Sequence, residues 1–490
     1  MERHLLLCLL ITTLVASTMA ADEEAQQRVA DRVTNLPGQP PGSFQHYSGY
    51  IQLQTQNEKA MFYWFFEAQT EPAVKPFVIW LKGDLAAHQW PLELHKKGPF
   101  LPLVIWLNGG PGCSSVAFGA AQEIGPFLVR RPSYFINRLT FNNYSWNQVA
   151  NLLFLESPVS VGFSYTNNSN DLLEIGDQVV ANDTLAFLLG WFKRFPDFKS
   201  NDFYIIGESY GGHYAPQLAD LIFETNKGAT QDSFINLKGF MMGNAVINDQ
   251  TDTLGIVDYA WSHGIISDKL YQSLKADCED FKLPHTSSRC NDQLKAFFDA
   301  FSGIDIFNIY SPVCVLNFSA TTNSSNLEDY QFEIPSTFDP CVNNYVRKYF
   351  NQKEVQRALH ANVTNLPYPY TLCSSQLTKW IDSPTTVLST ISKLLDAGMR
   401  IWTYSGDADA RVPVTSTRYS VNKLGLPVME EWRPWFYKRQ VAGWVETYDK
   451  GLILTTIRGG GHQAVLSARD WSLSLFTHFL SNTSLPSSSF

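Results

Sequence analysis

The serine in the Gly-Glu-Ser-Tyr-Gly run at 207–211 is the residue of this chain best placed for covalent chemistry. A strand-like apolar run (203–206) precedes it, and a helix-like run (214–223) follows. Glycines let the backbone turn sharply from strand to helix, and the turn exposes the hydroxyl at the helix N-terminus. This context predicts Ser209 as a nucleophile for acyl transfer. The alternative is a chance match, because the pattern is short.

A nucleophilic serine needs a histidine that takes its proton and a carboxylate that orients the histidine. His462 follows three glycines, Asp409 lies in an Asp-Ala-Asp loop, and each comes just after a strand-like run. The order serine, aspartate, histidine is that of α/β hydrolases. The sequence therefore predicts a Ser209–Asp409–His462 triad, with Asp407 as the alternative acid. The competing interpretation is that these are ordinary loop residues.

A glycine-rich run at 108–112 (Asn-Gly-Gly-Pro-Gly) predicts a second part of the site. It follows the strand-like run 103–107, and its backbone N–H groups have no side chains to block close approach. Such donors can stabilise the oxyanion of an acyl-transfer intermediate. A phosphate-binding loop is the alternative, but the Lys-Ser/Thr pair of that motif is missing. Tyr210, directly after the nucleophile, supplies a second N–H.

The elements that must position these residues alternate between apolar runs and amphipathic segments from about 45 to 245. Continuous apolar strands between helices predict a mostly parallel sheet covered on both faces. One helical face contains Ala181, Leu185, Leu188, Leu189 and Phe192. Most of the cysteines that follow the first twenty residues lie beyond 250. This predicts an α/β fold whose core is interrupted by a disulfide-tied cap.

The predicted organisation has one further irregularity, a near-repeat. The run 76–83 is almost identical to 102–109, and only the second copy continues into the glycine-rich loop. Two such strands would compete for one position in the sheet.

The predicted divisions are a signal peptide at 1–20, a first core part at 21–249 with an atypical insertion at 76–101, a cap at 250–390, a second core part at 391–484 and a tail at 485–490.

Composition excludes some classes of function. The chain has 490 residues, is 44% hydrophobic and carries a net charge of −9. That is enough apolar sequence for a large core, and the lack of Lys/Arg runs argues against a nucleic-acid partner. No close set of His, Cys, Asp and Glu has metal-ligand spacing, so we expect no cofactor and no metal.

The first twenty residues predict entry into the secretory pathway. The apolar run Leu5–Ala16 follows Arg3 and His4, and small residues suit cleavage after Ala20. The run is too short to span a bilayer. We therefore expect a secreted or vacuolar protein that has no contact with membranes after signal removal.

Cysteines and sequons agree with this route. Of seven cysteines, Cys8 lies in the predicted signal, and the other six suit disulfides in an oxidising compartment, although spacing leaves their pairing open. Seven Asn-x-Ser/Thr sequons are candidate glycosylation sites. These sites are Asn143, Asn167, Asn182, Asn317, Asn323, Asn362 and Asn482.

Four long motifs resemble those of the serine carboxypeptidases. They are Trp-Leu-Asn-Gly-Gly-Pro-Gly-Cys-Ser-Ser at 106–115, Glu-Ser-Pro-Val-Ser-Val-Gly-Phe-Ser-Tyr at 156–165, Gly-Glu-Ser-Tyr-Gly-Gly-His-Tyr at 207–214 and Gly-Asn-Ala-Val-Ile-Asn-Asp at 243–249. The region 415–435 resembles the plant serine carboxypeptidase-like branch, of the carboxypeptidase II and D kind. The resemblance covers about 30–480. It implies an α/β-hydrolase fold and release of C-terminal residues from peptides and proteins, and it is compatible with a homodimer.

The resemblance also implies roles for individual residues. The triad would be Ser209, Asp409 and His462, and the oxyanion would be bound by the N–H groups of Gly110 and Tyr210. The substrate carboxylate would be recognised by Asn108, Gly109 and Glu208, with Glu123 paired to Glu208. The implied disulfides are Cys113–Cys373, Cys278–Cys290 and Cys314–Cys341.

The implied carboxylate site has a physical logic. Two buried carboxyls in contact cannot both ionise, so one pKa rises well above its free value of about 4.3. A protonated Glu208 can donate a hydrogen bond to a peptide's terminal carboxylate, whereas an ionised one would repel it. We therefore expect activity that is best in acid. The alternative is that Glu208 is only a turn residue.

Three departures from the family pattern bear on the function. Val465 stands in the loop after the base where the family usually has proline, which alters the pocket wall but leaves the base in place. The glycines at 459–461 resemble those of acyltransferase relatives that use sugar esters, so acyl transfer is a second hypothesis, although the runs at 207–209 and 244–249 are more like those of the peptidases. The extra 26 residues before the glycine-rich loop are the third departure. A catalytically silent binding protein on the same scaffold is a third hypothesis, motivated by the insertion next to the oxyanion loop.

Overall fold

The computed structural model describes residues 22–53, 58–69, 101–133, 136–281, 287–314 and 339–489. The predicted signal peptide lies outside these residues, as do the first copy of the near-repeat and nearly all of the 76–101 insertion. The second copy forms strand β3 (Leu103–Asn108) in the middle of the sheet.

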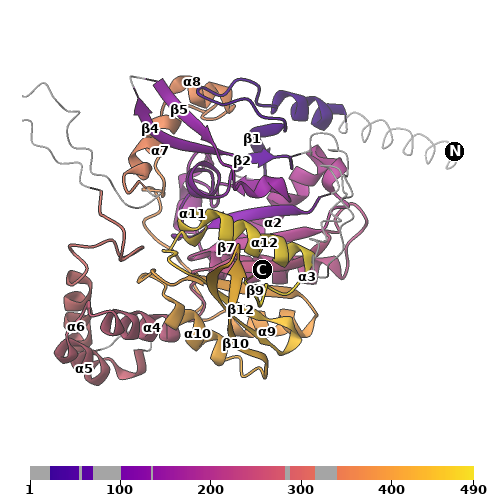
Figure 1. Ribbon diagram of the computed structural model, residues 1–490. Helices are drawn as coiled ribbons and strands as arrows, with labels where there is room; N and C mark the ends of the chain where they lie inside the picture. The colour runs from indigo at the N-terminus through magenta and orange to yellow at the C-terminus, as the bar shows by residue number, and fades with distance from the viewer. Residues whose placement is uncertain are drawn as a thin grey trace, which may run out of the picture.

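Within the described residues, ten strands form one sheet in the order β1-β2-β6-β3-β7-β8-β9-β12-β11-β10, and β4 pairs with β5 separately (Figure 1). The six strands from β6 to β12 in this order are parallel, and the outer strands are antiparallel. The strands are β1 (His46–Gln52), β2 (Ala60–Phe66), β4 (Phe127–Ser133), β5 (Ile136–Phe141), β6 (Asn151–Leu155), β7 (Phe203–Glu208), β8 (Leu237–Gly243), β9 (Arg400–Gly406), β10 (Val428–Tyr437), β11 (Gln440–Tyr448) and β12 (Ile453–Ile457).

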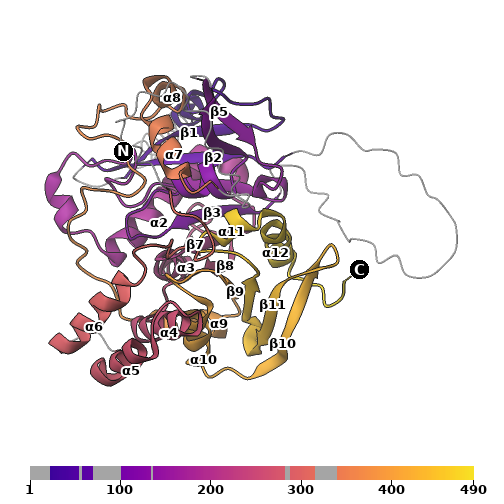
Figure 2. The same cartoon turned by 60° about the vertical axis from the view of Figure 1, so that its left-hand side comes forward.

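Helices cover both faces of this sheet, as the alternation of apolar runs predicts. Figure 2 shows the β10–β11 hairpin at the far end of the sheet from β1 and β2. Besides several short 3₁₀ turns, the helices of the described residues include η2 (Val116–Glu123), α2 (Asp177–Arg194), α3 (Gly211–Asn226), α4 (Asp249–Ser262), α5 (Asp268–Asp277), α6 (Ser288–Asp299), α7 (Val342–Phe350), α8 (Lys353–Ala358), α9 (Leu388–Asp396), α10 (Val414–Asn422), α11 (Ala464–Ser467) and α12 (Arg469–Ser481).

Strand β3 shows how the sheet divides the core. Val104 and Trp106 join the cluster under η2, α7 and α12. Leu103, Ile105 and Leu107 join the cluster under α2, α3 and α9. Successive side chains of a strand point to opposite faces, so a strand covered on both sides needs an unbroken apolar run.

Helix α2 forms over the predicted segment, but its buried face differs from the predicted one. Of the predicted face, Leu188 and Phe192 are buried, whereas Ala181, Leu185 and Leu189 are only partly buried. The other buried apolar side chains of the helix are Val180, Phe187 and Trp191. The helix has apolar residues over a wide arc, so periodicity alone does not select one side. Contact with the sheet and with the Phe195–Phe198 corner decides which side is buried.

The segment predicted as a single cap contributes to two regions. Helices α4, α5 and α6 form their own apolar cluster around the Cys278–Cys290 disulfide, at the lower left of Figure 1. Helix α7 instead packs into the main core, where the Phe350 ring contacts Trp64 and Phe163. The remaining disulfides are Cys113–Cys373 and Cys314–Cys341, so all three pairs are those that the family resemblance implies.

A buried acid, Glu156, ties the loop after β6 to the loop after β3. Its side chain is fully buried. Oε1 accepts hydrogen bonds from Ser114 Oγ (2.7 Å) and Tyr370 Oη (2.8 Å), and Oε2 accepts one from the Phe163 amide. Burial raises the pKa of Glu156 to about 7, although these three donors oppose the rise.

We expect Glu156→Gln to reduce the pH dependence of folding stability. Because the pKa of Glu156 is higher in the folded chain than in the unfolded one, its stabilising contribution is present in acid and is lost as the pH rises from about 4.5 towards 7. Each unit of this pKa difference corresponds to about 1.4 kcal/mol. Denaturant unfolding between pH 4 and 8 should show a smaller slope for the variant. An unchanged slope would contradict the assignment, and the exposed Glu354→Gln is the matched control.

Candidate active site

Ser209 lies in a strained turn between β7 and α3. Its φ is +62°, a left-handed conformation that is rare for residues with a side chain. A Cβ on Gly207 would lie 2.1 Å from the Gly211 carbonyl oxygen, so only glycine permits the turn. The Ser209 amide donates to the Gly243 carbonyl at the end of β8 (3.0 Å). The Gly-x-Ser-x-Gly pattern thus produces the sharp strand-to-helix turn expected of it.

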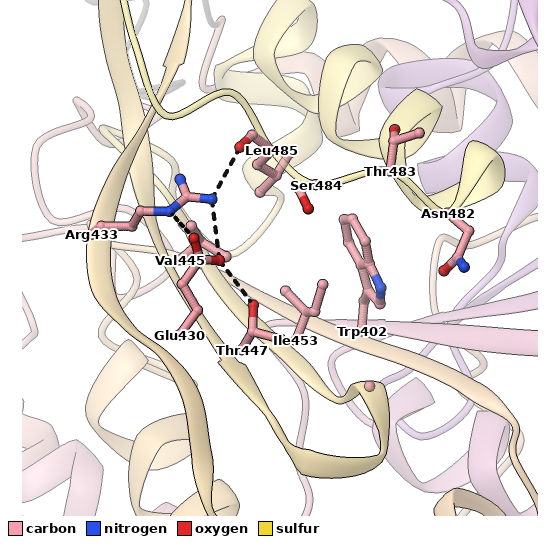
Figure 3. A pocket seen from close by; sticks show the side chains of 11 residues that line it. Trp402, Glu430, Arg433, Val445, Thr447, Ile453, Asn482, Thr483, Ser484 and Leu485 are labelled. Carbon is pink, nitrogen blue, oxygen red and sulfur yellow. Dashed lines mark hydrogen bonds and ion pairs between the residues drawn. The ribbon is translucent and has the colours of Figure 1, made fainter.

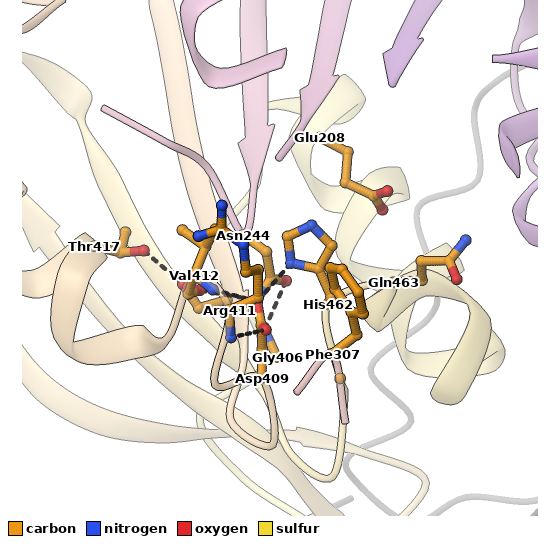
Figure 4. A network of polar contacts seen from close by, with 12 residues as sticks. Glu208, Asn244, Phe307, Gly406, Asp409, Arg411, Val412, Thr417, His462 and Gln463 are labelled. Carbon is orange, nitrogen blue, oxygen red and sulfur yellow. Dashed lines mark hydrogen bonds and ion pairs between the residues drawn. The ribbon is translucent and has the colours of Figure 1, made fainter. Parts of the chain in front are cut away.

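The structure brings the predicted base and acid into direct contact. His462 Nδ1 lies 2.7 Å from Asp409 Oδ2 (Figure 4), and the two side chains are 7% and 0% exposed. With Nδ1–H donating to the carboxylate, the other ring nitrogen, Nε2, is available to accept a proton. Asp407, the alternative acid, instead accepts a hydrogen bond from the Gly459 amide (2.6 Å).

Asn244 connects this pair to the serine turn, and sequence reasoning gave it no role. Its Nδ2 donates to Asp409 Oδ2 (2.8 Å), and its Oδ1 accepts from the Gly406 amide (3.0 Å). Among the described residues no hydrogen bond joins the Ser209 hydroxyl to His462. The end of β8 connects the serine turn to the Asp409–His462 pair. The Gly243 carbonyl accepts from the Ser209 amide, and Asn244 donates to Asp409. The Gly-Asn pair that opens the motif at 243–249 was the available signal.

The glycine-rich loop lies against the serine turn. A Cβ on Gly109 would lie only 2.2 Å from the Tyr210 amide nitrogen. Gly110 has a φ of +114°, a conformation that favours glycine. The Cys113–Cys373 disulfide anchors the loop, and the Ser374 amide donates to the Gly112 carbonyl (2.8 Å). The loop that carries Gly110 therefore lies beside Tyr210, as an oxyanion hole requires.

Three residues predicted for the carboxylate site lie together although they are far apart in the sequence: Asn108, Glu123 and Glu208. Asn108 Nδ2 is 3.0 Å from Glu208 Oε1 and 3.4 Å from Glu123 Oε1. Glu208 is 3% exposed and Glu123 is 1% exposed. Burial raises the pKa of both carboxyls, and repulsion from Glu123 adds to the rise at Glu208.

Two further residues line the site and were not predicted. Gln463 Nε2 donates to Glu123 Oε1 (2.6 Å). Phe307 from the cap accepts a hydrogen bond from the His462 amide at its carbonyl (2.6 Å), and its ring centroid is 5.2 Å from the imidazole. Figure 4 shows the Phe307 ring beside the imidazole of His462, and the Gln463 side chain extending away from it. Gln463 could have been noticed because it directly follows the base. Phe307 could not, because it lies in the predicted cap and the periodicity of apolar residues does not show which distant segments meet.

The side chain of Tyr210 is held by a second polar cluster. Its hydroxyl donates to Asp177 Oδ1 (2.8 Å), which also accepts from Trp380 Nε1 (2.8 Å). His213 Nδ1 contacts the other oxygen of Asp177 (3.2 Å), and its ring stacks on Tyr210 at 4.8 Å. These contacts fix the residue whose amide is the predicted oxyanion donor.

The predicted glycosylation sites differ in accessibility. Asn143, Asn167, Asn182 and Asn482 are exposed, and Asn362 is half-buried with its Nδ2 donating to Gln356 Oε1 (3.0 Å). Asn317 and Asn323 lie outside the described residues. Asn482 borders a cavity of about 210 Å³ between β10–β12 and the chain end (Figure 3). The residues that line this cavity include none of the predicted catalytic residues.

In the described part of the chain, no three His, Cys, Asp or Glu side chains are grouped as metal ligands. No helix in these same residues has the length and apolar character needed to cross a bilayer.

We expect Gly109→Ala to lower kcat about 100-fold, the scale of losing an oxyanion donor. The added methyl group would collide with the Tyr210 amide and displace either the loop or the serine turn. Hydrolysis of an activated ester measures the effect. Gly228→Ala is the matched control, because a Cβ there meets no atom within 4 Å. Equal activity of the two variants would show that the loop tolerates displacement.

Comparisons with known proteins agree with this arrangement. The family model for serine carboxypeptidase matches residues 37–84 and 86–482. Serine carboxypeptidase-like 35 of Arabidopsis thaliana is 50% identical, with 99% of this chain and 98% of the relative covered. Serine carboxypeptidase 24 of the same plant is 42% identical over 100% of both chains.

A solved structure supports the fold. Kex1(delta)p, a prohormone-processing carboxypeptidase from Saccharomyces cerevisiae, is similar with a TM-score of 0.71 at 22% identity. The similarity covers 93% of this chain and 96% of the yeast chain. Together with the sheet order, it identifies the α/β-hydrolase fold. The predicted resemblance is confirmed: the chain belongs to the serine carboxypeptidase family, whose members are serine-type hydrolases.

Proposed function

We propose that this enzyme is a serine carboxypeptidase that removes C-terminal residues from peptides and proteins through an acyl-enzyme, best at acidic pH. The observation that carries the proposal is the buried Glu208–Glu123 pair, directly beside the Ser209 turn and next to the Asp409–His462 pair. A carboxyl that burial and a neighbouring carboxyl keep neutral can donate a hydrogen bond to a substrate carboxylate.

In the proposed reaction, His462 takes the proton of the Ser209 hydroxyl as the oxygen attacks the last peptide carbonyl. Asp409 holds the imidazole in the required tautomer through Nδ1. The amides of Gly110 and Tyr210 bind the oxyanion. His462 then protonates the departing amine. In the second half, His462 takes a proton from water as the water oxygen attacks the acyl carbonyl, and it gives that proton to the Ser209 oxygen as the ester bond breaks and the acid product leaves.

The free carboxylate of the substrate is the feature that marks a chain end. We propose that it binds to Asn108 Nδ2, the Gly109 amide and a protonated Glu208. Each of these is a hydrogen-bond donor, and hydrogen bonds to a charged group contribute about 1.5–3 kcal/mol each. This arrangement would distinguish a chain end from an internal peptide bond.

Acyl transfer from a sugar ester is the second candidate function, and the glycines at 459–461 favour it. A blocked dipeptide, a glucose ester with an alcohol acceptor, and a fluorophosphonate label separate the possibilities. We expect peptide turnover and labelling at Ser209. Transfer from the ester alone would indicate an acyltransferase, and the absence of labelling would indicate a silent binding protein.

We expect Glu208→Gln to flatten the pH profile for peptide substrates. Because the pKa of Glu208 is raised, its neutral, donating form persists in acid and is lost as the pH rises through that pKa, so wild-type kcat/KM should fall about tenfold per pH unit beyond it. Glutamine donates at every pH. Measurement of kcat/KM between pH 4 and 8 tests this, and a variant profile identical to wild type would reject the role of Glu208.

We further propose that the protein follows the secretory route to a vacuole or the cell exterior. Within 250–390, we propose that α4–α6 and the segment around Phe307 act as the cap of the active site. The predicted signal, three disulfides and four exposed sequons support the route. The contact between Phe307 and His462 supports the role of the cap.

A further inference from the structure

The two buried carboxyls of the proposed substrate site do not have equal partners. Glu123 Oε1 accepts from Gln463 Nε2 at 2.6 Å and has Asn108 Nδ2 at 3.4 Å. Within the described part of the chain, Glu208 Oε1 has one donor, Asn108 Nδ2, at 3.0 Å. The second oxygen of each carboxyl is buried and has no hydrogen-bond partner among the described residues. Hydrogen bonds to an ionised carboxylate favour its charged form, so the donors favour charge on Glu123.

The surrounding charges act in the same direction. Arg469, at the start of α12, favours the ionised form of Glu123. Asp409 disfavours the ionised form of Glu208. Tyr404, on β9, faces both carboxyls and is neutral, because burial and these carboxyls raise its pKa. Arg469 thus stabilises a negative charge on Glu123, and Asp409 opposes a negative charge on Glu208.

We propose that Gln463 is a positioning residue that keeps the negative charge of the pair on Glu123 and the shared proton on Glu208. This inference rests on the proposed carboxypeptidase function. An ionised carboxylate only accepts, so the amide group of Gln463 must present its NH₂ to Glu123. The peptide bond between His462 and Gln463 then links the base to the site that recognises the chain end.

Loss of this donor would redistribute the proton. In Gln463→Met, a side chain of similar length without a donor, Glu123 holds a charge less well and competes for the proton. Glu208 would then ionise at lower pH, and the substrate carboxylate would meet a negative group. A substrate without that carboxylate would not sense the change.

The experiment compares pH profiles of kcat/KM for two substrates with the same acyl group, a blocked dipeptide and the ethyl ester of the blocked amino acid. For Gln463→Met we expect the alkaline limb of the dipeptide profile to move down by about one pH unit, with about tenfold lower activity beyond it. The ester profile should keep its wild-type limb. Gln27→Met is the matched control, because Gln27 also donates to a buried carboxylate, Asp31 (2.9 Å), in another part of the chain.

The outcomes separate this inference from the function on which it rests. The role of Gln463 would be overturned if the alkaline limb of the dipeptide profile of Gln463→Met stayed in place or moved up, or if the limbs of both substrates moved equally. The peptidase proposal would remain intact in either case. A wild-type enzyme that cleaves the ester but never the dipeptide would overturn the peptidase proposal itself. Should the methionine variant fail to fold, as judged by thermal unfolding, Gln463→Ala carries the same expectation.

Discussion

The register of the parallel strands is the constraint on which the site depends. In the sheet, Asn108 of β3 pairs with Glu208 of β7, Glu208 with Gly243 of β8, and Gly243 with Tyr404 of β9. These strands therefore end at one edge, as β9 and β12 do at Gly406 and Ile457. Asn108 and Glu208 lie at such ends, and Ser209, Asp409 and His462 lie in the loops that follow them. Because side chains alternate between faces, a shift of one residue in any strand would turn its contribution away from the site.

The same edge explains the glycines. Loops that meet there approach so closely that a Cβ on Gly109 would strike the Tyr210 amide, and one on Gly406 would lie 2.3 Å from the Gly461 carbonyl oxygen. Close backbone packing excludes water and brings amide donors together, which strengthens their interaction with a developing charge. Small residues here are therefore part of the chemistry as well as of the turns.

Burial of acids is the second physical theme of the molecule. Burial raises the pKa of Glu123, Glu156, Glu208 and Asp252, each of which is nearly or fully enclosed. Neutral carboxyls are easier to bury than charged ones, so these groups favour the folded chain in acid and oppose it as the pH rises. Substrate recognition and folding stability would thus favour the same acidic conditions.

The chain alone was sufficient to predict the alternating strands and helices, the family, and the loops that carry Ser209, Asp409 and His462. The strands, helices and loops follow from local rules, namely apolar runs, glycine turns and the order of motifs, and the family follows from the resemblance of four long motifs. It could not predict the buried side of α2, the division of the 250–390 segment between two clusters, or the contacts of Asn244, Gln463 and Phe307. Those depend on which surfaces meet in three dimensions. A hydrogen bond such as that from Gln463 to Glu123 joins residues 340 positions apart, and only the folded sheet edge brings them together.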